Sequence, residues 1–280
     1  MASALPAINA MLHATRLATP RNKVFSVIRE APALSYFAFV PEVFDPSRPP
    51  LVCVHGISRN AAEIAFAFAD EAARRGIALL APVFTKERHR HFQRLAEVDG
   101  GLRSDIAFNR MLGHAHETLG IGIEKVRLFG YSAGAQFAHR YTLLNPERVA
   151  GQTLFAAGWY TFPTAHEFPL GVGAPAGSTL PSLHLAEMLD IPTYVMVGTA
   201  DTRRDASVNC EPAVDQLQGP NRLERARRWV AAMRQAATDR KKAPRVTLTE
   251  ILNATHLFSR NLGRLNLPAQ VFDHLYCALR

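Results

Sequence analysis

Short apolar runs alternate with amphipathic segments along most of the chain. Most of the apolar runs end in small or polar residues, as buried parallel strands do. The segments between them place apolar residues every three or four positions, which is typical of helices that pack on a sheet. The expected strands are 24–28, 35–40, 51–54, 77–83, 126–130, 149–157, 192–197 and 246–252.

Several of the amphipathic segments carry start or stop signals for helices. Asn60 with Glu63, and Asn221 with Glu224, have the spacing of a capping box, in which side chain and backbone satisfy each other's first-turn donors. Gly76 is expected to end the first of these helices. Further helices are expected at 104–119, from 132 or 133 to about 144, and at 268–279, where Pro268 lies near the start.

The order strand, helix, strand, helix recurs about five times and predicts an α/β fold, a mostly parallel sheet with helices on both faces. The first two strands, on either side of Pro32, predict an opening hairpin. We find no internal repeat and no linker, so residues 23–280 are expected to form one domain. The Ala-rich residues 1–22 are expected to be an arm, either a surface helix or disordered.

The chemistry centres on the sequence Gly130-Tyr131-Ser132-Ala133-Gly134, which joins an apolar strand to a helix. In a nucleophile elbow, a serine occupies a strained strand-to-helix turn whose glycines allow the close approach of strand and helix. The helix N-terminus behind the serine favours negative charge that develops there. The alternative is an ordinary Gly-rich turn in which Ser132 only caps the helix.

Further candidates lie where other expected strands end. His55-Gly56-Ile57 follows one strand, Asp201 follows a later one, and His256 follows the last. Ligands of open α/β sheets bind outside the carboxyl ends of the strands, so these groups are expected to meet. Asp205 is a rival to Asp201, which we prefer because it follows its strand more closely. The order Ser, Asp, His is that of an α/β-hydrolase triad.

From about Val24 onward, these elements and motifs resemble the α/β-hydrolase superfamily. The His-Gly turn and the Gly-Tyr-Ser-Ala-Gly elbow are similar to small bacterial serine esterases, including polyester-depolymerase-like and dienelactone-hydrolase-like members. The resemblance implies that Ser132 attacks a carbonyl, that His256 is the base, and that Asp201 orients His256. The turn lacks the His-Gly-Gly-Gly form of some lipases and esterases, which disfavours that subgroup.

The same resemblance implies an oxyanion hole made by the backbone N–H groups of Ile57 and Ala133. His55 would then orient its turn and would not act as a second base. No organic cofactor and no metal is implied, and the sequence has no dinucleotide or Walker-type glycine loop. The three cysteines, which are far apart, favour neither a disulfide framework nor a zinc site.

Residues 159–190 are an irregular, aromatic stretch that is expected to leave the sheet on the site's side. We interpret it as a lid-like insertion and expect Tyr131, Trp159, Tyr160 and Phe162 to bind substrate. The alternative, ordinary packing under a long loop, stays open. An apolar wall of this size predicts a short-to-medium acyl chain or an aromatic acid.

Composition narrows the class further. The chain has 280 residues, 48% hydrophobic and 20% charged, which is typical of a globular protein with a sizeable core. No apolar run is long enough to span a membrane, and no basic segment precedes the Ala-rich start, so neither a membrane span nor a signal peptide is expected. The sequence indicates a cytoplasmic protein.

The formal net charge of +8 is spread along the chain. Its densest cluster, residues 86–91, is interpreted as a solvated loop that favours negatively charged substrates, and nucleic acid is not an expected partner. The sequence therefore predicts a hydrolase that cleaves a small carboxylic ester through an acyl-enzyme. Acyl transfer, or hydrolysis of an amide or thioester, would use the same triad. A non-catalytic ligand-binding protein on this scaffold is the alternative of another class.

Overall fold

A computed structural model describes residues 14–18, 24–28, 34–95, 102–174 and 180–277. Its centre is a nine-stranded sheet with the order β1-β2-β3-β5-β4-β6-β7-β8-β9. The strands are β1 Ala14–Ala18, β2 Val24–Ile28, β3 Tyr36–Phe39, β4 Leu51–Val54, β5 Leu79–Pro82, β6 Val126–Tyr131, β7 Val149–Phe155, β8 Thr193–Gly198 and β9 Val246–Ile251.

The sheet is mixed at one end and parallel through its middle. The pairs β1–β2, β2–β3 and β3–β5 are antiparallel, and β5, β4, β6, β7, β8 and β9 run parallel to one another. The predicted fold class and the opening β2–β3 hairpin are therefore confirmed. Because the parallel strands share one direction, their carboxyl ends meet along a single edge of the sheet.

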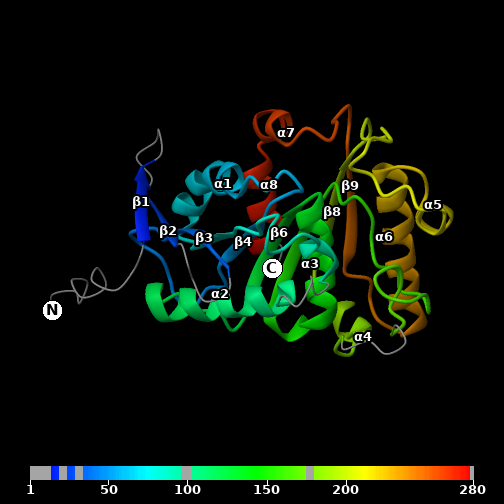
Figure 1. The fold of residues 1–280 in the computed structure, drawn as a ribbon, viewed down its shortest axis with the longest axis horizontal. Helices are drawn as coiled ribbons and strands as arrows, with labels where there is room; N and C mark the ends of the chain where they lie inside the picture. Colours follow the sequence, from blue (N-terminus) through cyan, green and yellow to red (C-terminus); the bar gives the residue numbers. More distant parts are fainter. Residues whose placement is uncertain (1–13, 19–23, 29–33, 96–101, 175–179, 278–280) are drawn as a thin grey trace.

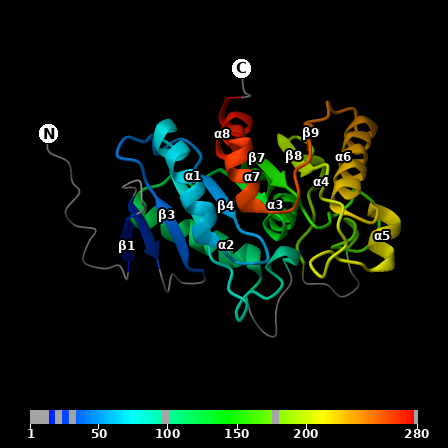
Figure 2. The ribbon, with the colours of Figure 1, turned by 90° about the horizontal axis from the view of Figure 1, so that it is seen from above.

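Helices cover both faces of the sheet (Figures 1 and 2). The helices α2, α3 and α6 cover one face, and α1, α7 and α8 cover the other. The bounds are α1 Ala61–Arg75, η2 Phe92–Arg94, α2 Ser104–Leu119, α3 Ala133–Leu144, η3 Pro146–Arg148, α4 Leu185–Met188, α5 Pro212–Gln218, α6 Arg222–Asp239, α7 Phe258–Leu265, α8 Leu267–Phe272 and η4 Asp273–Cys277.

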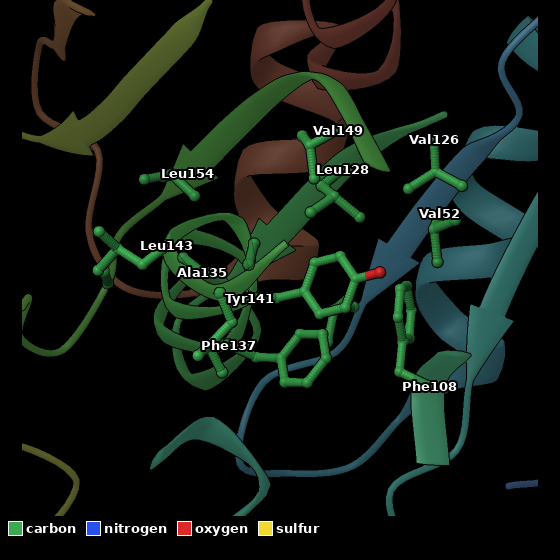
Figure 3. Packing of buried hydrophobic residues seen from close by; sticks show 14 of the residues in the cluster. Val52, Phe108, Val126, Leu128, Ala135, Phe137, Tyr141, Leu143, Val149 and Leu154 are labelled. Carbon is green, nitrogen blue, oxygen red and sulfur yellow. The ribbon is translucent and has the colours of Figure 1, made fainter. Parts of the chain in front are cut away.

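Each face of the sheet has its own buried core. Figure 3 shows the core under α2 and α3, where Phe108, Phe137 and Tyr141 pack beside Val52 and Leu128 of the sheet. The rings of Phe108 and Tyr141 meet edge to face with centroids 4.8 Å apart. Both helices are thereby fixed against the central strands, so the N-terminus of α3 has a set position relative to β4 and β6.

The predicted side-chain caps at the starts of α1 and α6 form. The Asn60 side chain accepts a hydrogen bond from the Glu63 backbone N–H, and Asn221 does the same with Glu224. Gly76 ends α1 in the left-handed conformation, at φ 62°, as the sequence predicts. Both ends of α1 and the start of α6 were therefore predictable from neighbouring residues in the sequence.

Two predictions about the chain ends need correction. Residues 14–18 of the predicted arm form strand β1, because pairing with the free edge of β2 outweighs the helix propensity of an Ala-rich segment. Residues 1–13 and 19–22 lie outside the described residues. The expected closing helix begins at Leu267 with Pro268 in its first turn, but from Asp273 to Cys277 it continues as a π-helix. Helix α7 was not predicted.

The start of the aromatic segment after β7 is a buried layer rather than a lid. Tyr160 is fully buried and stacks on Trp229 of α6, with ring centroids 4.7 Å apart. Gln218 binds the backbone of Tyr160 at both its N–H and its carbonyl, and Trp229 Nε1 donates to the Thr161 carbonyl. For residues 160–162 the lid interpretation is therefore wrong, because α5 and α6 supply a partner surface that cannot be recognised from the local sequence.

In the part of the chain that the structure describes, no helix combines the length and the apolar character needed to cross a membrane.

Candidate active site

Ser132 occupies a strained turn between β6 and α3. Its φ of 54° lies in the left-handed region, which residues with a side chain rarely adopt. The turn is tight because a Cβ on Gly134 would lie 2.0 Å from the Val54 carbonyl oxygen, and a Cβ on Gly130 would lie 2.4 Å from the Gly134 oxygen. Only glycine fits at these two positions, and this close approach holds the Ser132 side chain at the carboxyl end of the sheet.

The structure brings Ser132, His256 and Asp201 together from three separate loops. His256 Nε2 lies 3.1 Å from Ser132 Oγ, and His256 Nδ1 lies 2.8 Å from Asp201 Oδ2. Asp201 and Ser132 are buried, whereas the side chain of His256 keeps about a quarter of its surface exposed. Since Nδ1 donates to the carboxylate, Nε2 is left free to accept a proton from the serine hydroxyl.

Asp201 is held on its other side by Arg222, which the sequence analysis missed. Arg222 Nη1 donates to Asp201 Oδ1 at 3.1 Å, and Nη2 donates to Ser207 Oγ at 2.6 Å. The rival Asp205 has a half-exposed side chain that accepts hydrogen bonds from the backbone and hydroxyl of Ser207. These bonds lower the pKa of Asp205. The carboxylate that reaches His256 is therefore Asp201.

The turn after β4 places Ile57 and its neighbours beside Ser132. Within the described residues, neither the Ile57 N–H nor the Ala133 N–H has a hydrogen-bond acceptor. For Ala133 this follows from its place as the first residue of α3, where helix N–H groups lack intrahelical partners. Two free donors next to a serine hydroxyl are the arrangement that can bind an oxyanion.

His55 fixes the shape of that turn. Its Nε2 accepts a hydrogen bond from the Phe84 N–H at 3.0 Å, which leaves Nδ1 to donate to the Gly56 carbonyl at 2.8 Å. Burial lowers the pKa of His55 to about 4, so the ring is neutral at neutral pH. This position agrees with the predicted orienting role, since both ring nitrogens are occupied by backbone groups.

Tyr131 contacts both the loop after β9, which carries His256, and the turn after β4. Its hydroxyl donates to the His256 carbonyl oxygen, and its ring lies against the His256 ring with centroids 5.2 Å apart. A Cβ on Gly56 would come within 3.0 Å of the Tyr131 ring, so the turn after β4 lies directly against this ring. Burial, and then the charge of Asp201, raises the pKa of the Tyr131 hydroxyl, which stays protonated.

A cavity of about 730 Å³ opens above these residues. Its lining includes two exposed apolar side chains, Ile57 and Leu257, and two arginines, Arg203 and Arg260. The full lining is Gly56, Ile57, Ser58, Asn60, Glu63, Ile64, Tyr131, Ser132, Ala200, Asp201, Arg203, Asp205, Ser207, Thr255, His256, Leu257, Phe258, Ser259 and Arg260.

A second cavity of about 200 Å³ adjoins the first at Ser132 and Ile57. Trp159 lines this second cavity, whereas Tyr160 and Phe162 line neither cavity and are buried in the core. Of the four predicted substrate-binding residues, the structure thus brings Tyr131 and Trp159 to the site. Tyr160 and Phe162 are corrected to core positions: Tyr160 stacks on Trp229 of α6, and Phe162 belongs to the same buried cluster.

Among the described residues, no three His, Cys, Asp or Glu side chains gather in a way that would hold a metal ion.

The sequence matches no family profile and no curated protein, but the structure has many neighbours among solved structures. One is a poly(3-hydroxybutyrate) depolymerase from Bordetella parapertussis, which is 28% identical over 93% of this chain and 90% of that one, with a TM-score of 0.72. The chain has the α/β-hydrolase fold. The serine, aspartate and histidine described above occur in the chain order of that fold's triads.

Two more distant structures share the α/β-hydrolase fold. The poly(aspartic acid) hydrolase-1 of Sphingomonas sp. KT-1 has a TM-score of 0.73 at 21% identity, over 92% of this chain and 98% of that one. A fluorophosphonate-binding serine hydrolase of Staphylococcus aureus has a TM-score of 0.52 at 12% identity, over 94% and 97%. At these identities the likeness shows the fold alone. The structural neighbours include serine hydrolases, esterases and depolymerases.

Proposed function

We propose that the protein is a serine hydrolase that cleaves a carboxylic ester through an acyl-enzyme. The observation that carries this proposal is the contact chain from Ser132 Oγ to His256 Nε2 and from His256 Nδ1 to Asp201. A serine, a base and a group that orients the base are what nucleophilic catalysis needs, and here they lie within hydrogen-bond reach of one another.

In the first step, Ser132 Oγ attacks the ester carbonyl while its proton passes to His256 Nε2. The tetrahedral oxyanion accepts hydrogen bonds from the Ile57 and Ala133 N–H groups. His256 then gives its proton to the leaving alcohol oxygen, and the acyl group stays on Ser132. In the second step His256 takes a proton from water, whose oxygen attacks the acyl carbon, and the acid leaves as Ser132 regains its proton.

The open cavity supports a small or flexible ester as the substrate. Because Tyr160 and Phe162 belong to the core, the apolar contacts for the ester come from Ile57, Leu257 and Tyr131. The adjoining second cavity has a volume of only about 200 Å³ and offers Ile57 and Trp159 as apolar contacts. We therefore propose a short-to-medium acyl chain, with each buried methylene adding about 0.8 kcal/mol until the pocket is full.

The test is a panel of p-nitrophenyl esters of increasing acyl length, together with labelling by a fluorophosphonate. Wild type should take up the label and turn over short esters. The Ser132→Ala variant should lose the label and lower turnover by several orders of magnitude, because binding and the oxyanion hole alone remain. Near-wild-type turnover in a folded Ser132→Ala variant would refute the proposal, and so would a wild type that neither labels nor hydrolyses any ester.

A further inference from the structure

Two of the residues that line the second cavity each have a buried donor atom without a hydrogen-bond partner. It is lined by Gln93 and Arg94 of η2, Gln136 of α3, Trp159 after β7, and Asn209 in the loop after β8. Asn209 Nδ2 and Arg94 Nε are buried and have no hydrogen-bond partner. The Asn209 amide is held in this orientation because its Oδ1 accepts the Glu211 N–H at 3.0 Å.

A buried cation lies directly behind this cavity. Arg140 of α3 is fully buried, and its guanidinium lies 4.3 Å from the ring centroid of Trp159. Its Nε donates to Thr161 Oγ1 and its Nη1 to the Gln93 carbonyl, and both of these acceptors are neutral. Its Nη2 has no hydrogen-bond partner. Arg94 lies near the same ring, with its guanidinium 5.5 Å from the centroid.

Arg140 differs from the other fully buried arginines, Arg222 and Arg225, in having no carboxylate partner within the described part of the chain. Arg222 is paired with Asp201, and Arg225 is paired with Asp215. Arg140 forms no ion pair with any carboxylate of the described residues, and Arg94 has only Glu211 at 3.8 Å, where both side chains are exposed. Burial, and then the nearby Arg94, lowers the pKa of Arg140, so this cation is held at a cost in free energy. Because an arginine stays protonated in proteins, its charge calls for an anion nearby.

The position of the cavity says which part of an ester would supply the anion. Its lining includes Ser132, Ile57 and Ala133 but not His256, which lines only the larger cavity. His256 must protonate the leaving alcohol, so the alcohol side of the ester lies in the larger cavity. The acyl side is thereby directed to the second cavity, toward Arg94 and Asn209.

We propose that the second cavity is a carboxylate-binding subsite and that the preferred substrates are monoesters of dicarboxylic acids. This inference rests on the proposed function. Arg94 and Asn209 donate to the free carboxylate of the acyl group, and the charge of Arg140 attracts that carboxylate from behind the wall formed by Gln136 and Trp159. The free carboxylate is the anion that the described residues do not provide.

The test compares monoethyl glutarate with ethyl pentanoate, which has the same acyl length but no carboxylate, by following released ethanol. For wild type, kcat/KM should be at least about tenfold higher for the glutarate monoester, the effect of one charge-assisted hydrogen bond. Diethyl glutarate, in which the carboxylate is capped, should behave like ethyl pentanoate.

Two variants and one control test which residues recognise the carboxylate. Arg94→Gln removes the donor in the cavity, and Arg140→Met removes the buried charge at similar volume, so each should lower the glutarate-to-pentanoate ratio about tenfold. Arg88→Gln removes an exposed charge from the 86–91 cluster and should leave the ratio unchanged. If Arg140→Met fails to fold, Arg94→Gln still tests the subsite, because the Arg94 side chain is partly exposed and is not a core contact.

The outcomes separate this inference from the proposed function. Equal kcat/KM for both esters in wild type, or a ratio that Arg94→Gln leaves intact, overturns the carboxylate subsite while ester hydrolysis stands. If Arg88→Gln lowers the ratio as much as Arg94→Gln does, the preference comes from the overall positive charge of the protein. That result also overturns the carboxylate subsite. No turnover of any ester and no fluorophosphonate label would instead remove the proposed function itself.

Discussion

Arg222 Nη1 lies 3.1 Å from Asp201 Oδ1, and both side chains are almost completely buried. The carboxylate that orients His256 is thus compensated from behind by a cation on α6. The same guanidinium reaches Ser207 in the loop after β8, so it joins a helix, a strand end and a loop under the site. An isolated buried carboxylate would be costly, and Arg222 makes an ionised Asp201 tolerable in this position.

Removal of Arg222 should therefore affect both stability and turnover. We expect Arg222→Met to lower the free energy of unfolding by about 3 kcal/mol, because a buried carboxylate loses its partner. It should also lower kcat more than it raises KM, since Asp201 then orients His256 less well. Urea unfolding and ester kinetics measure the two effects. The control is Arg227→Met on the same helix, whose ion pair with Glu250 is partly exposed and should therefore contribute little to stability. Equal effects of the two variants would contradict the assigned role.

The two aspartates after β8 should differ sharply in turnover. Asp201→Asn is expected to lower kcat by about 10⁴, because the amide favours the wrong tautomer of His256. Asp205→Asn should be far milder, as its side chain binds Ser207 at the surface. Ester kinetics on both variants, with circular dichroism as the check on folding, decide the point. The reverse order of effects would make Asp205 the acid.

Alanine substitutions at two helical glycines should change stability in opposite directions. Gly134→Ala should destabilise the protein by about 3 kcal/mol, because the added methyl group would overlap the Val54 carbonyl. Gly113→Ala in α2 has no heavy atom within 4 Å of the new Cβ and should stabilise by about 0.5–1 kcal/mol through helix propensity. Thermal unfolding of both variants is the measurement. A Gly134→Ala variant as stable as the parent would show that the elbow can relax.

Stability should fall on mild acidification, in part through His55. Its folded-state pKa is about 4, against 6.5 for a free histidine, so the unfolded chain binds the proton more tightly. The stability that neutral His55 provides is complete above about pH 6.5 and is lost as the pH falls toward 4, which amounts to about 2 kcal/mol between pH 7.5 and 5. Urea unfolding across this range measures the loss.

His55→Gln is the matched variant for that measurement. The glutamine oxygen can accept the Phe84 N–H but does not titrate, so the pH dependence should shrink by the His55 share. Burial also lowers the pKa of His89 to about 4, so part of the dependence should remain. An unchanged pH dependence in His55→Gln would contradict the assigned burial of His55.

Local signals account for most of what the sequence predicted. Three kinds of local pattern predicted the structure within a few residues: the N-caps at Asn60 and Asn221, the glycine at position 76, and the apolar runs of the central strands. Ser132 was identifiable because its elbow needs glycines at fixed spacing. The meeting of Ser132, Asp201 and His256 followed from one topological rule, that parallel strands bring their carboxyl ends to a common edge.

Contacts between distant segments account for what the sequence did not predict. Tyr160 and Phe162 have the composition of a binding surface, and contacts with distant segments, such as the stacking of Tyr160 on Trp229 of α6, turn them into core residues. Arg222 and Arg140 are two arginines among many basic residues, and nothing near them in the chain marks them as buried. Strand β1 forms because the edge of β2 is free, which is a property of the assembled sheet.

The positive φ of Ser132 is required for activity but lowers thermal stability. A serine at φ 54° costs the folded state free energy, typically about 1–3 kcal/mol, that a glycine at the same position would not. Ser132→Gly should therefore unfold at a higher temperature than the parent while losing the nucleophile. A screen for heat resistance alone would favour glycine at position 132 and would therefore enrich inactive variants. Directed evolution of the protein must select for turnover in every round.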